Sequence, residues 1–404
     1  MKKNILMIMF DGFPVYRTNL YGGMIQTPNL EVLVEKSTFY SNVITAAPST
    51  AMSLTSMFTG LYPHEFGRRS YSDVDSGLPP NTTSLFQDLE DIGYNTYVLW
   101  DKHMETGNPI KYRINVWQGS KTKFLHYNES FNNKYVSTLV DGIILNKTGQ
   151  TGDMKEALSS LNDMKSPWAA FVRIGGQVSP YFRGASNNKT NYSGDDVVYE
   201  IDHVIKMLLD NFPDNTRFIL CSDHGRMAGE QGILGYAFNL AEGTLKVPII
   251  VYDPEIKNGE INEELISLIN FKKIILNQPL RKTKYLYADS GYADQWHRKT
   301  MIRKNNWKYV FHRDGWPCKE QLFDLQTDPH ELINLAEPHY EDPYRDQRPK
   351  GDTVDVNNSP SGENLNGNPL NKVLPRSDWK NIMNTLKELR IERKRIWEEQ
   401  KVFE

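Results

Sequence analysis

Five short apolar runs, each followed by polar or glycine residues, constrain the fold of this chain more than any other feature. The runs cover residues 4–10, 94–100, 168–174, 215–221 and 246–252. Short, almost continuously apolar runs are typical of strands that are buried on both faces of a parallel sheet. Between them, residues 28–36, 85–92 and 195–211 carry apolar side chains at helical spacing. Alternating strands and helices predict an α/β fold around a sheet. Pro248 lies in the run 246–252 and favours an edge position for that strand, or a place at the strand's start.

Ionisable residues follow three of these runs. They are Asp11, the group Asp101-Lys102-His103, and the pair Asp223-His224. Open α/β sheets bind ligands at the carboxyl ends of their strands, and carboxylate oxygen with imidazole nitrogen suits zinc, manganese and similar ions. The alternative for each group is a solvated turn without chemistry.

A second feature is the segment from Thr45 to Gly67. Pro48 precedes Ser49 and Thr50, which are both N-cap residue types, and a mostly apolar run then extends to Gly60. The segment therefore predicts a short helix, whose N-terminus would suit a phosphate or sulfate group. The alternative is a capped core helix with no ligand.

Composition excludes several classes of protein. The chain has 404 residues with 47 Lys and Arg against 50 Asp and Glu, so its charge favours neither nucleic acid nor an anionic membrane as a partner. Cys221 and Cys318 form neither a disulfide framework nor a zinc-binding pattern. The apolar start is too short for a signal peptide, and no run reaches the roughly 18 apolar residues of a membrane span. We expect a cytoplasmic protein, and the oligomeric state stays open.

The character of the sequence changes after residue 255, so we expect one domain over 1–255 and a smaller one over 256–404. Residues 261–276 predict one or two short helices, and 300–312 predict a hairpin that turns at Asn305-Asn306. Residues 338–376 are rich in Pro, Asn, Asp and Gly and predict a long polar loop. A charged helix is expected over about 378–401.

Taken in order along the chain, these motifs resemble those of the sulfatase-like proteins in the alkaline phosphatase superfamily. The resemblance implies an alkaline-phosphatase-like α/β/α sandwich around a mixed, mostly parallel sheet, with a smaller C-terminal α+β subdomain. The matching segments are the first strand with Asp11, Leu20-Tyr-Gly22, Thr27-Pro-Asn-Leu30, Thr59-Gly-Leu-Tyr-Pro63, Gly93-Tyr-Asn-Thr96, Ser222-Asp-His-Gly225, Val247-Pro-Ile-Ile-Val251, Leu322-Phe-Asp-Leu-Gln-Thr-Asp-Pro329 and Asn334-Leu-Ala336.

The resemblance also implies a nucleophile. The family carries it nine residues before the Thr of Thr-Gly-x-Tyr-Pro, which here is Thr50. Typical sulfatases have a Cys or Ser there, in the pattern C/S-x-P-x-R, that is oxidised to formylglycine. Thr50 cannot give formylglycine, so none is expected; phosphodiesterase and phosphoethanolamine-transferase branches use an unmodified Thr. The neighbouring Ser49 is the alternative hydroxyl.

By the same resemblance, Asp11, Thr50, Asp223 and His224 would hold a divalent cation, which can be calcium, magnesium, manganese or zinc. Gln177, Gln231 and Tyr236 stand where relatives often carry further metal or anion ligands, so the chain resembles a one-metal enzyme or one whose site has drifted.

The remaining candidate site residues are implied more weakly. His103 matches a family histidine with Lys102 beside it, and both are predicted to contact the leaving group or the anion. Ser49, Ser53 and His297 are weaker substrate-binding candidates.

Three functions follow from this resemblance. We favour a metal-dependent hydrolase of phosphate, phosphonate or sulfate esters, acting through a covalent intermediate on a small-molecule or glycan ester. The alternatives are a phosphoryl-group transferase that uses the same residues, and a non-catalytic binding protein that has lost part of its metal site.

Overall fold

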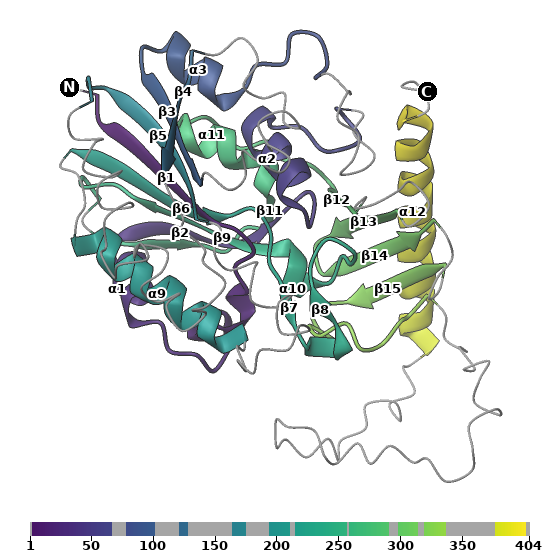
Figure 1. Ribbon diagram of the computed structural model, residues 1–404. Coiled ribbons are helices and arrows are strands. Elements are labelled where there is room, and N and C mark those ends of the chain that lie inside the picture. Colours follow the sequence, from purple (N-terminus) through teal and green to yellow (C-terminus); the bar gives the residue numbers. More distant parts are fainter. Residues whose placement is uncertain are drawn as a thin grey trace, which may run out of the picture.

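The computed structural model describes residues 2–66, 78–101, 121–127, 164–174, 194–210, 215–256, 258–290, 298–313, 319–336 and 376–400. Its largest element is a nine-stranded sheet with the order β10-β2-β9-β6-β1-β5-β3-β4, in which β11 also pairs with β2 (Figure 1). The strands are β1 (Asn4–Phe10), β2 (Ser37–Ile44), β3 (Asn95–Asp101), β4 (Lys123–Tyr127), β5 (Trp168–Ile174), β6 (Thr216–Ser222), β9 (Lys246–Tyr252), β10 (Glu260–Asn262) and β11 (Ile266–Ser267).

The sheet is mixed and mostly parallel, as predicted. Strand β1 runs parallel to both β5 and β6, whereas β9 is antiparallel to β2 and β6. Because β9 lies between two strands, an edge position for Pro248 is wrong, and Pro248 instead lies near the start of β9. The missing N–H of Pro248 is accommodated because β6 pairs with β9 only from Ile249 onward, and β2 is irregular between Tyr40 and Val43.

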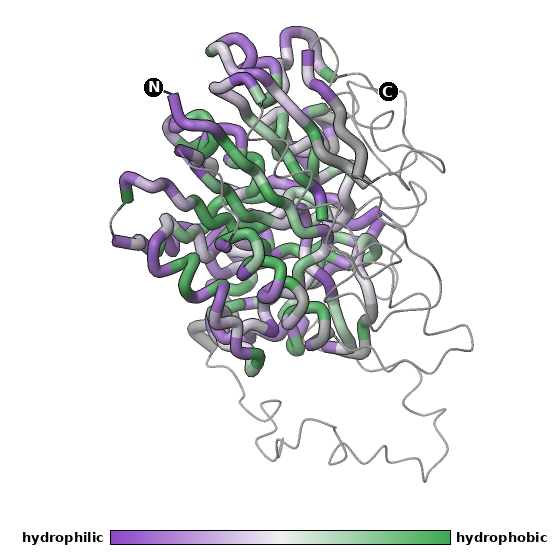
Figure 2. Tube along the Cα trace, turned by 60° about the vertical axis from the view of Figure 1, so that its left-hand side comes forward, coloured by the Kyte–Doolittle hydropathy of each residue, from purple (hydrophilic) through white to green (hydrophobic). Residues whose placement is uncertain are grey.

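Helices cover both faces of this sheet, which confirms the predicted α/β/α layering (Figure 1). One face carries α1 (Pro28–Val34) and α9 (Gly194–Asp210), and the other carries α2 (Thr50–Thr59), α3 (Leu85–Asp91) and α11 (Phe271–Ile275). Strand β1 contributes alternate side chains to the two hydrophobic clusters: Leu6, Ile8 and Phe10 enter one, and Ile5, Met7 and Met9 enter the other. The green central strands in Figure 2 mark this doubly buried layer.

A second sheet is antiparallel and has the order β12-β13-β14-β15. Its strands are β12 (Leu286–Ser290), β13 (Lys299–Lys304), β14 (Trp307–His312) and β15 (Glu320–Asp324). The hairpin predicted over 300–312 is β13 and β14, and Asn305 takes a positive φ of 52° at its turn. The C-terminal helix α12 (Arg376–Gln400) packs along this sheet through a cluster that includes Tyr309, Leu322 and Leu386 (Figure 1).

Residues 261–276 differ from the prediction of short helices alone. They contain the strands β10 and β11, the short 3-10 helix η7 (Leu268–Asn270) and then α11. Both strands lie parallel to β2, so the large sheet continues beyond residue 255. The division of the chain into domains at 255 and 256 stays a prediction.

Buried charges connect the two sheets. Glu242 lies in α10 (Glu242–Leu245), just before β9, and its carboxylate contacts Arg303 of β13 at 2.6 Å and Lys308 of β14 at 3.1 Å. The Lys308 side chain has no exposed surface and also contacts Glu331 at 2.6 Å. Buried ions of this kind require partners, so the position of α10 depends on the small sheet. Among the helices that the structure describes, none is long and apolar enough to cross a bilayer.

Candidate metal and catalytic site

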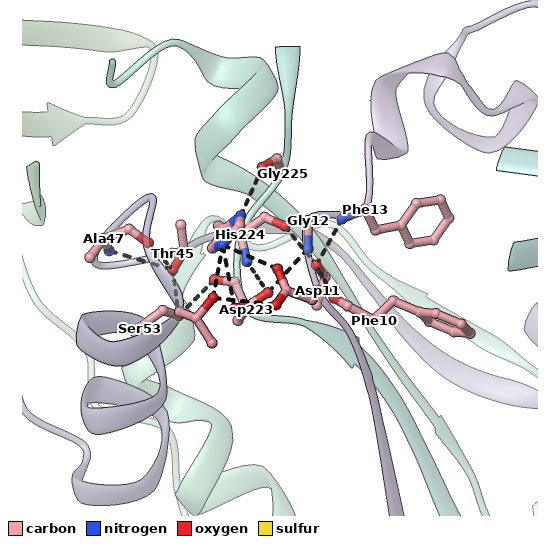
Figure 3. Close-up of polar contacts among 12 residues, drawn as sticks. Phe10, Asp11, Gly12, Phe13, Thr45, Ala47, Ser53, Asp223, His224 and Gly225 are labelled. Atoms are coloured by element: carbon pink, nitrogen blue, oxygen red, sulfur yellow. Dashed lines mark hydrogen bonds and ion pairs between the residues drawn. The ribbon is translucent and has the colours of Figure 1, made fainter. Parts of the chain in front are cut away.

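The site lies where β1 and β6 end. These strands are adjacent and parallel, with Phe10 opposite Ser222, so the residues that follow them meet at one edge of the sheet. The Ser222 hydroxyl accepts a hydrogen bond from the Phe13 backbone N–H at 3.2 Å and lies 2.7 Å from the Phe10 carbonyl, which ties the two strand ends together. Figure 3 shows Asp11, Asp223 and His224 converging at this point.

Asp11, Asp223 and His224 form the group of metal-ligating side chains that the described residues contain. One ligand atom from each lies within 4.8 Å of the others, and all three residues are buried. The Nε2 atom of His224 is 3.6 Å from Asp11 Oδ1 and 3.4 Å from Asp223 Oδ2. Neither of these two oxygens accepts a hydrogen bond from any residue in the described part of the chain. Two buried carboxylate oxygens are thus directed at one point beside an imidazole nitrogen.

The backbone fixes the orientation of His224. Its Nδ1 atom lies 2.9 Å from the carbonyl oxygen of Gly225 (Figure 3). A carbonyl oxygen only accepts, so Nδ1 carries the hydrogen, and in the neutral ring Nε2 is left as the atom with a lone pair. That lone pair faces Asp11 and Asp223, so all three groups present acceptors to one another.

Tyr236 covers one face of the His224 imidazole. Its ring is stacked on His224 with centroids 4.4 Å apart and an angle of 19° between planes. A turn with a positive φ of 70° at Ala237, closed by a 2.8 Å hydrogen bond from the Phe238 N–H to the Tyr236 carbonyl, fixes the chain beside Tyr236. This conformation is uncommon for a residue with a side chain, so it marks a constrained segment beside the site.

Thr50 enters the site as the first residue of α2. Its Oγ1 atom is 3.3 Å from His224 Nε2 and 3.5 Å from Asp11 Oδ2. The preceding Ser49 occupies the N-cap position, yet its hydroxyl makes no capping bond and has no hydrogen-bond partner within the described segments, although it is buried. The N-terminus of α2 therefore presents one hydroxyl to the acceptor cluster and a second one without a partner.

Ser53, one turn further along α2, is engaged in structural bonds. Its hydroxyl donates to the Asp223 carbonyl at 2.6 Å and lies 2.9 Å from the Thr45 hydroxyl (Figure 3). The Oδ1 atom of Asp223 accepts from the backbone N–H groups of His224 at 3.0 Å and Gly12 at 3.3 Å. These bonds hold the Asp223 carboxylate so that Oδ2 faces the cluster.

The two carboxyl groups have different electrostatic environments. Burial, together with the nearby Asp11 charge, raises the pKa of Asp223 to about 6 despite the opposing effect of Arg173. Burial also acts on Asp11, but the neighbouring guanidinium groups of Arg173 and Arg226 outweigh it and hold the pKa of that carboxyl below its ordinary value. Asp11 is therefore the carboxylate that the site stabilises in the ionised form.

Two buried arginines at this site were missed by the sequence reasoning. Arg173 on β5 forms an ion pair with Asp11 through Nη2, and both side chains are buried. Arg226 has no exposed surface, and its guanidinium lies 5.3 Å from the centroid of the Tyr236 ring. The available signal was a charged residue inside the otherwise apolar run 168–174, and another two residues after His224.

The other predicted site residues fall into two groups. Lys102, His103, Gln177 and His297 lie outside the described residues. Gln231 is described and exposed, and its side-chain amide donates to the His330 carbonyl rather than to Asp11, Asp223 or His224. The structure thus brings together Asp11, Thr50, Asp223 and His224, with Ser49 and Ser53 beside them on α2.

This donor set fits a divalent cation. The two orphaned carboxylate oxygens and the imidazole nitrogen are ligands for which calcium, magnesium, manganese and zinc compete. A cation among three acceptors would also remove the repulsion between their lone pairs.

The sulfatase family model matches residues 3–278 of this chain. Arylsulfatase K of Xenopus laevis is 22% identical over 431 residues, covering 83% of this chain and 79% of that protein. An arylsulfatase of Clostridium perfringens (strain 13 / Type A) is 22% identical over 448 residues, covering 83% of this chain and 90% of that protein.

Solved structures agree in fold. A 2-O GAG sulfatase has a TM-score of 0.60 at 16% identity, over 86% of this chain and 89% of that one. The phosphonate monoester hydrolase of Agrobacterium radiobacter has a TM-score of 0.59 at 15% identity, over 86% of this chain and 93% of that one. With a family match over more than half of its length and the fold of these hydrolases, the chain belongs to the sulfatase family of ester hydrolases.

Proposed function

We propose that this protein hydrolyses a phosphate, phosphonate or sulfate ester with Thr50 as nucleophile and a divalent cation held by Asp11, Thr50, Asp223 and His224. The observation that carries the proposal is the convergence of the Thr50 hydroxyl, 3.3 Å from His224 Nε2, with two buried carboxylate oxygens that lack hydrogen-bond partners in the described part of the chain. Family membership supports an ester as the substrate.

Thr50 would perform the covalent step. Its Oγ1 forms a bond to phosphorus or sulfur while the bond to the leaving alkoxide breaks, and water then hydrolyses the resulting ester of Thr50. In the resting site the Thr50 hydroxyl donates to Asp11 Oδ2 at 3.5 Å. Because Arg173 holds Asp11 in the ionised form, the hydroxyl proton would pass to solvent as the attacking alkoxide forms. A bound cation would supply Lewis-acid chemistry by lowering the pKa of the attacking hydroxyl and polarising the ester oxygens.

The N-terminus of α2 supports binding of the anionic group. Thr50 begins this helix of 10 residues, and the buried Ser49 hydroxyl beside it has no partner among the described residues. The helix dipole and the unpaired N–H groups of the first turn favour an anion at this position. Lys102, His103 and His297 remain predicted contacts to the leaving group or substrate.

The substrate class is proposed from relatives. The choline-sulfatase of Rhizobium meliloti (strain 1021) is 33% identical over 152 residues, which cover 31% of this chain and 28% of that protein. That protein's name refers to a small-molecule sulfate ester, whereas a 2-O GAG sulfatase shares the fold and acts on a glycan. We therefore propose a small-molecule or glycan ester as the substrate, with no formylglycine needed for attack by Thr50.

The test compares hydrolysis of aryl phosphate, phosphodiester, phosphonate and sulfate substrates by the wild type, Thr50→Ala and Thr50→Ser, together with metal content. Thr50→Ala should lower kcat by at least about 1000-fold, because the nucleophile is lost. Thr50→Ser retains the hydroxyl and should keep measurable turnover on the preferred ester. Turnover by Thr50→Ala equal to that of the wild type would exclude Thr50 as the nucleophile.

A non-catalytic binding protein is the second candidate function. It is favoured by the ion pair of Arg173 with Asp11, which occupies part of the proposed metal site, and by the engagement of Gln231 elsewhere. An intact protein that binds no divalent cation and turns over none of the four ester classes would support this second function. Transfer of a phosphoryl-linked group to an added acceptor alcohol, measured in the same assays, would instead indicate a phosphoryl-group transferase that uses the same residues.

A further inference from the structure

Arg173 is an unusual residue for its position in the sheet. Strand β5 lies between β1 and β3, and all seven of its residues are buried. In the parallel register Met9 faces Arg173, so the side chain of Arg173 reaches Asp11 just beyond the end of β1. A guanidinium is almost never buried inside a sheet unless it is paired. The partner of Arg173 therefore indicates what this side chain does in the sheet.

Arg173 pairs with Asp11 in the part of the chain that the structure describes. Arg173 Nη2 contacts Asp11 Oδ2, and the two side chains are only 5% and 2% exposed. The other oxygen, Oδ1, lies 3.6 Å from His224 Nε2 in the acceptor cluster. Asp11 Oδ2 is thus bonded to the Arg173 guanidinium, whereas Asp11 Oδ1 is directed at the proposed metal position.

We propose that Arg173 competes with the divalent cation for Asp11 and so sets how tightly this site holds metal. The inference rests on the proposed function in one respect, namely that a cation binds at Asp11, Asp223 and His224. Its physical basis is the repulsion between like charges in a buried site, together with the loss of Oδ2 as a second ligand atom. Because a guanidinium keeps its proton in proteins, Arg173 carries its positive charge throughout the pH range in which the protein is folded.

Arg226 should act in the same direction but more weakly. Its side chain is fully buried, and its positive charge helps to lower the pKa of Asp11. Its guanidinium also lies over the Tyr236 ring, at 5.3 Å from the centroid. Removing the Arg226 charge therefore reduces repulsion without freeing the Asp11 oxygen that Arg173 holds.

The test is calorimetric titration of MnCl₂ into metal-stripped wild type, Arg173→Met, Arg173→Lys and Arg217→Met. Arg173→Met should bind Mn²⁺ about tenfold more tightly or better, the scale on which groups bonded to metal-ligating side chains change affinity. Arg173→Lys keeps the charge and should remain near the wild type. Arg217 is a matched control, because it is on β6 of the same sheet but donates to the carbonyls of Ile274 and Ile275.

The outcomes separate this inference from the proposed function. Binding by Arg173→Met alone, with none by the wild type, would support the competition and overturn the metal-dependent function. Equal affinity in both proteins, whether both bind Mn²⁺ or neither does, would overturn the competition. If thermal denaturation shows that Arg173→Met does not fold, Arg173→Gln takes its place, because its neutral amide also removes the charge beside Asp11. No gain in Mn²⁺ affinity there would overturn the competition.

Discussion

The imidazole of His224 lies flat against the ring of Tyr236, with the two centroids 4.4 Å apart. A second contact fixes the ring at its Nδ1 atom, which lies 2.9 Å from the Gly225 carbonyl oxygen. His224 is therefore held by a ring face and by a backbone bond, so its Nε2 points at Asp11, Asp223 and Thr50.

Tyr236→Leu should lower both Mn²⁺ affinity and kcat by about tenfold, because the imidazole loses the aromatic face that limits its rotation. Tyr236→Phe keeps that face and should remain within about threefold of the wild type. Titration calorimetry and ester hydrolysis measure the two quantities. Equal values for the Leu and Phe variants would show that the stacking does not position His224.

Ser53→Ala should destabilise the protein by about 1–3 kcal/mol and lower kcat, since the buried Asp223 carbonyl loses the donor at 2.6 Å. Ser56→Ala is a matched control on the same helix. The Ser56 hydroxyl is buried and has no partner among the residues that the structure describes, so its removal should be nearly neutral. Denaturant unfolding and steady-state kinetics check both variants. Equal losses of stability and kcat in the two variants would show that the Ser53 hydroxyl does not hold Asp223 in place.

Lys308→Met should lower the free energy of unfolding by about 3–5 kcal/mol, because Glu242 and Glu331 would be left as buried charges without the lysine between them. Lys394→Met removes an exposed lysine 3.8 Å from Glu398 and should change stability by less than about 1 kcal/mol. Urea unfolding monitored by circular dichroism measures both. A small effect of Lys308→Met would show that the charges between the sheets are not coupled to stability.

Glu242 should make stability depend on acid pH. Burial raises the pKa of this carboxyl, but Arg303 and Lys308 overcome that effect and lower it from 4.5 to about 2. A lowered folded-state pKa stabilises the protein above pH 4.5, and this contribution is lost as the pH falls from 4.5 toward 2. Glu242→Gln should be less stable at neutral pH and lose less stability over that interval; parallel pH curves for the two proteins would contradict this prediction.

Much of the fold was predictable because strands that are buried on both faces of a sheet consist of short, almost continuous apolar runs. The run at 168–174 and the apolar stripe of α9 each correspond to an element of the structure. Strands β10 and β11 were not predictable, since elements of three and two residues are too short to show a period of two. They form because they extend an existing sheet edge at β2.

The site was predictable only in part. Asp11, Asp223 and His224 come together because they directly follow or lie close to the ends of adjacent parallel strands, a relation that sequence position already implies. The position of Arg173 depends instead on the register between β1 and β5, which the sequence does not specify. The orientation of Tyr236 over His224 depends on the local turn at Ala237, whose positive φ has no sequence pattern.

Strands β10 and β11 also matter for anyone who shortens this protein. A chain ending at residue 255 would lose both, and β2 would then present its backbone N–H and C=O groups to solvent along an uncovered edge. An exposed edge of this kind recruits strands from other molecules. Self-association of such a fragment would therefore reflect the lost edge cover, and a fragment that retains residues through 275 keeps that cover in place.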